Sequence, residues 1–162
     1  MNGNLARLKS RISKIGFMIA GVVVFAAAPA YATLGGSVDT IQTDVHALHA
    51  RVIATQPHAL YSVHEITYGA TKVREYANTN GIVFAIAWNG LTHPDLSKLL
   101  GTYYAGYKAK IQSRPPQIKG ELLRTLRVGK LVVQMGGHMR DVVGRAYDSS
   151  LIPSGVSLSD IK

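Results

Sequence analysis

Residues 60–88 read LYSVHEITYGATKVREYANTNGIVFAIAW, and this stretch decides the fold. Its residue pattern has a period of two, which is typical of β-strands. The pattern predicts three strands, at residues 60–68, 72–78 and 82–88. Gly69-Ala70 separates the first two, and Asn80-Gly81, a dipeptide that favours a tight hairpin turn, precedes the third. Because the third strand is apolar on both faces, we expect it to lie in the centre of a sheet whose two faces are both covered.

Upstream of these strands, apolar side chains recur at alternating spacings of three and four residues. They are Val38, Ile41, Val45, Leu48 and Val52. This spacing predicts one narrow apolar stripe along a helix, with Ser37 as N-cap, Asp39 in the first turn and an end near Gln56-Pro57. The opposite face is polar, so the helix would pack on one side only, within the domain or against a partner chain.

Downstream, Thr92-His93-Pro94-Asp95 resembles a capping box with proline in the first turn, and it predicts a second helix that ends at Pro115-Pro116. The apolar face of that helix is Leu96, Leu99, Leu100, Tyr103, Tyr107 and Ile111. Three further strands are predicted at residues 122–128, 131–135 and 139–147. They turn at Gly129-Lys130 and around Gly136-Gly137, and residues 149–162 follow as a loop-like tail.

The predicted order is therefore helix, three strands, helix, three strands. Short connections require antiparallel neighbours, so the fold class is α+β: a single small domain with a mostly antiparallel sheet of about six strands and two helices. A small β-barrel with flanking helices, made from the same strands, is the alternative.

The N-terminal residues have the pattern of a Sec signal peptide. Four basic residues and no acidic one precede an uncharged apolar run at residues 15–28. The basic residues are Arg7, Lys9, Arg11 and Lys14. We expect cleavage between Ala32 and Thr33, which makes residues 1–32 the signal peptide and residues 33–162 the mature domain, periplasmic or secreted. An uncleaved inner-membrane anchor is the alternative. The 14-residue apolar run is shorter than the roughly 20 residues that span a bilayer, so we expect no transmembrane segment after cleavage.

Composition limits the classes of function. The chain contains no cysteine, which excludes disulfides, thiol chemistry and lipid attachment through cysteine. The mature residues carry 14 basic and 9 acidic side chains, a net charge of +5. Nucleic acid is scarce in a bacterial envelope, so this charge favours an anionic envelope polymer or a lipid surface as partner. Another exported protein is the alternative partner, and no nucleic acid is expected.

Positive charge is concentrated between residues 108 and 130. This segment holds seven basic residues against Glu121 alone, a net charge of +6. The basic residues are Lys108, Lys110, Arg114, Lys119, Arg124, Arg127 and Lys130. We predict that they form an anion-contact surface, and the alternative is an ordinary solvated helix end and loop.

A second candidate site lies in the last strand pair. Gly136 and Gly137 permit a positive φ and a close backbone approach that leaves amide groups for an anion. Arg140 and Arg145 add planar donors that suit a carboxylate or a phosphate. We therefore predict ligand contact by Gly136, Gly137, His138, Arg140 and Arg145, whereas a plain glycine-rich hairpin turn explains the glycines equally well.

Several short motifs are spread over the mature chain. They are Leu34-Gly35-Gly36-Ser37, residues 61–66, residues 73–76, Pro94-Asp95-Leu96 with Leu99-Leu100-Gly101, Gly136-Gly137-His138-Met139-Arg140, and Val143-Gly144-Arg145-Ala146-Tyr147. Together they resemble the exported Gram-negative bacterial family known as domain of unknown function 2844. The resemblance implies export and a single domain, and it supplies no activity, ligand or catalytic residue.

Catalytic and metal-binding patterns are weak. His64-Glu65 suggests a general base, but adjacent strand residues face opposite sides of a sheet, and Glu65 can instead pair with Arg74 across the first hairpin. His46 and His49 have a spacing that can chelate a metal. Only Asp39 or Asp44 could complete a local set, and the pair lies on or beside the polar face of the predicted helix, which favours solvated histidines. We therefore expect no metal and no cofactor.

These observations favour an exported, non-enzymatic binding or assembly module that contacts anionic envelope components. The alternative is a small periplasmic hydrolase or transferase that acts on cell-wall or surface polymers. That alternative requires at least two of His64, Glu65 and His138 to converge in one cleft.

Overall fold

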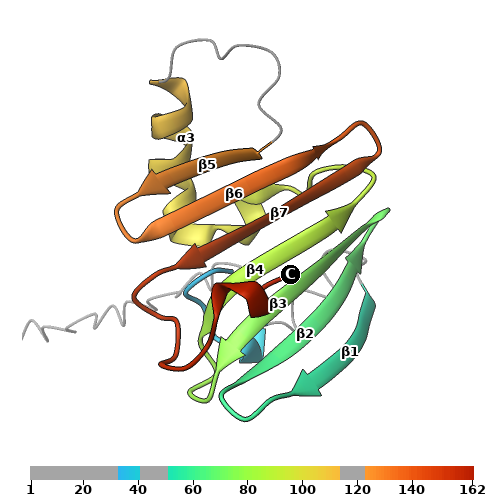
Figure 1. Ribbon diagram of the computed structural model, residues 1–162, viewed down its shortest axis with the longest axis vertical. Helices are drawn as coiled ribbons and strands as arrows, with labels where there is room; N and C mark the ends of the chain where they lie inside the picture. Colours follow the sequence, from blue (N-terminus) through green and yellow to red (C-terminus); the bar gives the residue numbers. More distant parts are fainter. Residues whose placement is uncertain (1–32, 41–50, 114–122) are drawn as a thin grey trace, which may run out of the picture.

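Seven antiparallel strands form one open sheet in the order β1-β2-β3-β4-β7-β6-β5 (Figure 1). The computed structural model describes residues 33–40, 51–113 and 123–162. The strands are β1 (Arg51–Pro57), β2 (Tyr61–Tyr68), β3 (Thr71–Asn78), β4 (Val83–Gly90), β5 (Leu123–Val128), β6 (Leu131–His138) and β7 (Asp141–Asp148). Two strand groups that are separate in sequence therefore meet where β4 pairs with β7.

The strands predicted over residues 60–88 are confirmed as β2, β3 and β4. Gly69 and Gly81 take positive φ values of 58° and 73° in the two connections, as their turn positions predicted. Every residue from Val83 to Trp88 is buried, which confirms that β4 is central and covered on both faces.

The helix predicted over residues 38–56 is wrong in its last part. A short 3-10 helix, η1 (Val38–Thr40), begins after Ser37, and residues 41–50 lie outside the described residues. Arg51–Pro57 is the edge strand β1, and Thr55 in it pairs with His64 of β2. Val52, Ile53 and Thr55 are β-branched residues, which suit a pleated strand. Pairing with β2 therefore determines the structure of this segment in place of the helical spacing.

The second predicted helix forms in pieces: α2 (Leu96–Leu99), η2 (Gly101–Tyr103) and α3 (Tyr104–Gln112). Asp95 is the N-cap of α2, because its carboxylate accepts a hydrogen bond of 2.9 Å from Ser97 N. Gly101 breaks the helix with a φ of 49°, and a Cβ there would lie 2.7 Å from Thr33 Oγ1. The close passage of the N-terminal segment therefore explains the break.

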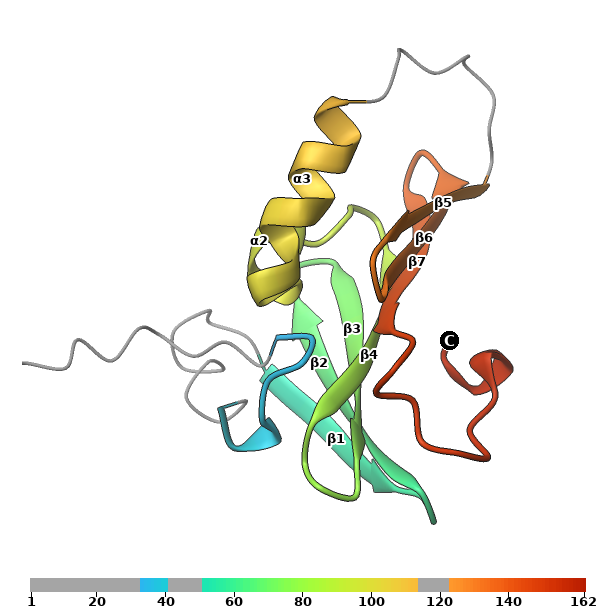
Figure 2. The ribbon, with the colours of Figure 1, turned by 90° about the vertical axis from the view of Figure 1, so that its left-hand side faces the viewer.

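The sheet separates two cores (Figure 2). On the helix face, α2, η2 and α3 cover side chains of the sheet that include Val73, Ile86 and Trp88. On the tail face, the segment of residues 149–162 packs through residues that include Ile161. The sheet residues beneath it include Tyr76, Phe84, Ala85, Ala87 and Tyr147. Within the described residues the fold is thus α+β, with seven strands where about six were predicted, in an open sheet rather than the alternative barrel.

The turn predicted around Gly136-Gly137 lies elsewhere. Both glycines belong to β6, and the β6–β7 connection is Met139-Arg140, since His138 pairs with Asp141. Arg140 takes a positive φ of 66°, a conformation that non-glycine residues seldom adopt. Gly137 has a φ of 98°, and a Cβ there would lie 2.1 Å from Asp141 O, so the predicted close backbone approach is present within the strand pair.

The segment that follows the predicted cleavage position is built into the domain. Leu34 is buried, and its N–H donates to Leu99 O at 3.0 Å. Gly35 N–H donates to Val83 O at 2.8 Å, which fixes this segment beside β4. In the part of the chain that the structure describes, no helix is long and apolar enough to cross a membrane.

Candidate functional site

Two arginines occupy one row across the tail face of the sheet. The strand register pairs Arg74 of β3 with Ala87 of β4, and pairs Ala87 with Arg145 of β7. Arg145 in turn pairs with Gln134 of β6. Because Ala87 packs in the core on the tail face, its neighbours in the row also face the tail. The small side chain between the arginines leaves room that the tail fills, since Ala87 is fully buried in the same core as Ile161.

Arg145 fastens the tail to the sheet. Its Nε donates to Gln134 Oε1 at 2.6 Å, and its Nη1 donates to the carbonyl oxygens of Leu158 and Ile161, the latter at 3.1 Å. Leu158 is the first residue of η3 (Leu158–Asp160), a short turn that Ser157 caps, and Ile161 follows the turn. Leu158 O also accepts from Ile161 N at 3.4 Å. The guanidinium contacts both ends of the turn and so fixes the path of the tail.

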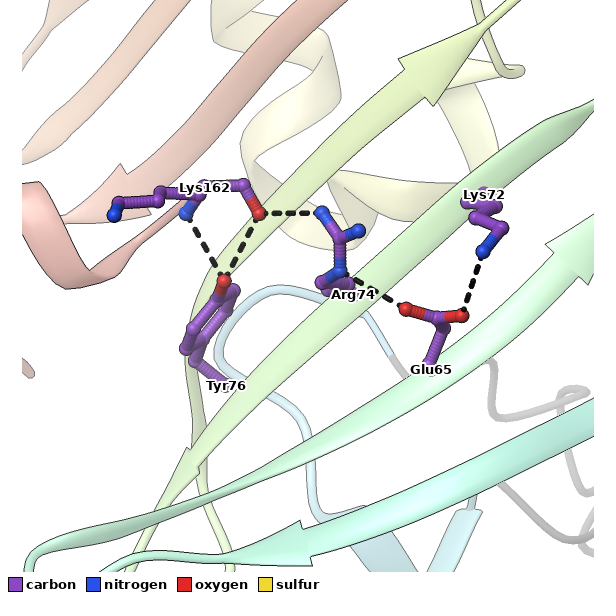
Figure 3. A network of polar contacts seen from close by, with 5 residues as sticks. All are labelled: Glu65, Lys72, Arg74, Tyr76 and Lys162. Carbon is purple, nitrogen blue, oxygen red and sulfur yellow. Dashed lines mark hydrogen bonds and ion pairs between the residues drawn. The ribbon is translucent and has the colours of Figure 1, made fainter.

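Arg74 makes the corresponding contacts from the other side (Figure 3). Its Nε donates to Glu65 Oε2 at 3.0 Å, and its Nη1 donates to Lys162 O at 2.8 Å. Tyr76 Oη donates to the same oxygen at 3.0 Å and accepts from Lys162 N at 3.0 Å. Two side chains of β3 thus hold the backbone of one tail residue.

Glu65 completes this network (Figure 3) and confirms the cross-strand pair with Arg74. Its other oxygen lies 3.3 Å from Lys72 Nζ. Burial raises the pKa of this carboxyl, but hydrogen bonds from Lys72 and Arg74 outweigh burial and hold the pKa below its ordinary value. Glu65 is therefore a charged structural partner that orients Arg74.

A cleft of about 490 Å³ opens beside these arginines. Its lining residues are the cationic Arg74, Arg145 and Lys162, the polar Asn89 and Gln134, and the apolar Trp88, Met135, Val143 and Ile161. Trp88 and Met135 belong to the lining while their side chains pack in the core on the helix face. Gly136 and Gly144 complete the lining, which contains no acidic residue. The volume lies within the range of small-molecule sites, and the charge suits an anion.

Asn89 adds a polar group that the protein leaves unsatisfied. Its Oδ1 is buried, and the structure shows no hydrogen-bond partner for it among the described residues. Buried polar atoms generally have partners, so this acceptor is an exception among the residues that line the cleft.

The structure brings together only part of the predicted ligand contact. Gly136 and Arg145 line the cleft, whereas Gly137, His138 and Arg140 are exposed at the far end of the β6–β7 hairpin. His138 Nε2 lies 3.9 Å from Asp141 Oδ2, and both side chains face solvent. Sequence reasoning missed Arg74 and Asn89 as site residues, because only the order of the strands places them beside Arg145.

The predicted anion-contact surface is divided. Lys108, Lys110, Arg127 and Lys130 are exposed, Arg114 and Lys119 lie outside the described residues, and Arg124 is described only in its backbone. Leu126 and Val128 pack in the core on the helix face, so Arg127 between them faces the tail side of β5. Arg127 therefore lies on the face of the sheet opposite the lysines of α3.

The residues proposed for catalysis lie apart. His64 faces the helix side, where its ring nitrogens contact Ser62 Oγ at 3.0 Å and Thr55 Oγ1 at 3.2 Å, and burial lowers its pKa. Glu65 faces the tail, and His138 ends β6, on the far side of β3, β4 and β7. The convergence that the hydrolase alternative requires does not occur for these three residues. His46 and His49 lie outside the described residues, and within the described ones no group of three or more His, Asp or Glu side chains could hold a metal ion.

Comparison with known proteins gives one match. A family model described as "Protein of unknown function (DUF2844)" matches residues 30–161. Neither the curated proteins nor the solved structures contain a match to this chain.

Proposed function

The chain belongs to the DUF2844 family of proteins of unknown function, as its motifs predicted, and on that premise we propose its role from the cleft: a non-enzymatic binding module of the bacterial envelope. The bound group is an anion, a carboxylate or a phosphate, held between Arg74 and Arg145. The row of these two arginines across Ala87 is the observation that carries the proposal.

The guanidinium groups are held in place and still have donors to offer. In each arginine, Nε and Nη1 contact protein groups, and among the described residues Nη2 has no protein partner. Planar guanidinium groups held in this way are suited to paired hydrogen bonds with carboxylate or phosphate oxygens. The cleft lining carries these two guanidinium groups and no Asp or Glu side chain, which favours the same ligand charge.

Export is part of the proposal and comes from the sequence pattern. Leu34, two residues after the predicted cleavage position, is buried, which is consistent with a mature domain that starts at Thr33. Amino-terminal sequencing of the exported protein tests this step. Thr33 as first residue supports export and cleavage, and an intact Met1 contradicts them.

Calorimetric titration with inorganic phosphate tests anion binding at the cleft. We expect saturable binding that weakens as salt rises, because exposed charges are screened over about 8 Å at 0.15 M ionic strength. The double variant R74Q/R145Q should lose this binding. R127Q removes one exposed charge outside the cleft and should retain it.

Two further measurements keep this test decisive. The double variant also loses contacts to the tail, so circular dichroism and a thermal melt must show that it is folded. R74K/R145K keeps both charges but loses the planar donors, so it should bind phosphate weakly. Equal binding by the parent and R74Q/R145Q, or no saturable binding by the parent, contradicts the proposal.

A further inference from the structure

On the tail face of the sheet, the row of residues next to the arginine row differs from it in polarity. The next row on this face pairs Asn89 of β4 with Val143 of β7, and Val143 with Gly136 of β6. Ile161 of the tail is buried beside the arginine row, whereas Val143 is 42% exposed. The exposed apolar surface beside the cationic row is therefore that of Val143.

This surface is continuous with the cleft. Val143 and Ile161 both line the cleft together with Arg74 and Arg145. Gly136 of β6 pairs with Val143 and has no side chain. The cleft is therefore not obstructed beside Val143 on the side of β6. A ligand whose charged group lies between the arginines can therefore extend over Val143 without displacing a large side chain.

The size of the cleft also exceeds what a small anion requires. About 490 Å³ is within the range of sites that hold whole organic ligands. Among the apolar residues of its lining, Trp88 and Met135 turn their side chains to the core on the helix face, and Ile161 is buried. Val143 therefore supplies the exposed apolar contact beside the arginines.

From these observations we propose that the ligand is a single-chain anionic amphiphile, with its charged head between Arg74 and Arg145 and its apolar chain over Val143. The proposal rests on the proposed function and specifies the class of ligand. Charge complementarity selects the head, and the exposed side chain of Val143 beside it selects the chain. Free phosphate and the phosphate head of an alkyl chain share the same recognition chemistry, so experiment must separate them.

Calorimetry with three probes, each below its micelle concentration, makes the separation: decyl phosphate, inorganic phosphate and decyl maltoside. Full burial of a methylene group contributes roughly fourfold in affinity. Because the cleft is open on one side, we expect decyl phosphate to bind at least about tenfold more tightly than inorganic phosphate. Decyl maltoside has the same chain without the charge and should bind at least about tenfold more weakly than decyl phosphate.

A matched pair of variants locates the chain. V143Q should weaken decyl phosphate about fivefold or more and leave inorganic phosphate unchanged. L91Q makes the same kind of change at another exposed apolar residue, 53% exposed and outside the cleft lining, and should leave both unchanged.

The outcomes separate this inference from the function on which it rests. If decyl phosphate binds no more tightly than inorganic phosphate or than decyl maltoside, the amphiphile proposal is wrong. The proposed anion binding is still tested separately by the titration with inorganic phosphate. An unchanged affinity of V143Q for decyl phosphate also overturns it. Loss of all binding to inorganic phosphate would instead reject the proposed function.

Discussion

The hydroxyl of Tyr103 donates a hydrogen bond of 2.5 Å to Asp148 Oδ2 and so joins the helical layer to the end of β7. Asp148 is 3% exposed, and its other oxygen accepts from Ser150 N and Ser150 Oγ, each at 2.7 Å. Burial raises the pKa of Asp148, but the hydrogen bonds from Tyr103 and Ser150 outweigh it, and the pKa lies below its ordinary value. The buried carboxylate is thus charged and depends on its donors.

The substitution Y103F should destabilise the domain. It removes one donor from a buried carboxylate and keeps the ring, and hydrogen bonds to charged groups contribute about 1.5–3 kcal/mol. We expect a loss of about 2 kcal/mol in the free energy of unfolding, measured by urea denaturation. Y104F alters a partly buried tyrosine next in the chain and should cost less than about 0.5 kcal/mol. Equal effects of the two variants would show that the bond to Asp148 contributes nothing.

The stability of the domain should fall at alkaline pH. Burial, followed by the hydrogen bond to Asp148 and its charge, raises the pKa of Tyr103 from 10.0 to about 12. The contribution of this group is fully present below pH 10, where the unfolded chain is also protonated, and is lost as pH rises from 10 to about 12. Urea denaturation at several pH values should show this decline in the parent and a smaller one in Y103F. An equal loss of unfolding free energy at alkaline pH in the parent and in Y103F would contradict the assignment of this decline to Tyr103.

The substitution G144A should disturb the only tryptophan of the chain. A Cβ at Gly144 would lie 2.3 Å from Trp88 Cζ2, so the indole must move. Overpacking of this kind costs about 1–3 kcal/mol. The expected result is a lower urea midpoint together with a shift in the tryptophan emission. An unchanged emission maximum and midpoint would mean that the ring does not lie against Gly144.

The N-terminal segment should contribute to stability as a part of the core. Leu34 is 1% exposed, and replacement of a buried leucine by alanine costs about 2–5 kcal/mol, so L34A should be strongly destabilising in urea denaturation. L60A removes the same atoms from a residue that is 42% exposed and serves as the control. Similar losses in the two variants would contradict the docking of the segment beside β4.

Local patterns predicted the elements that depend on neighbouring residues. The period of two in residues 60–88 defines β2 to β4, and Gly69 and Gly81 mark their connections because glycine, which has no Cβ, accepts a positive φ at low cost. The same reasoning failed at the β6–β7 connection, where Arg140 rather than a glycine takes the positive φ. It also failed at Arg51–Pro57, because pairing with β2 overrides the helical spacing that ends at Val52.

The cleft could be predicted only in part, because it is a product of strand order. Arg145 and Gly136 belong to a motif that suggests anion binding, and both line the cleft. Arg74 looks in the sequence only like a hairpin partner of Glu65. Its approach to Arg145 follows from the pairing of β4 with β7, a contact between distant segments that no local pattern contains.

The most direct measurement follows the side-chain Nε–H resonances of the arginines by NMR during a titration with inorganic phosphate. The account predicts that the resonances of Arg74 and Arg145 shift together with one saturable dissociation constant, while that of the exposed Arg127 changes little. Shifts of equal size at Arg127, or unchanged resonances at Arg74 and Arg145 at saturating phosphate, would contradict an anion site between these two residues.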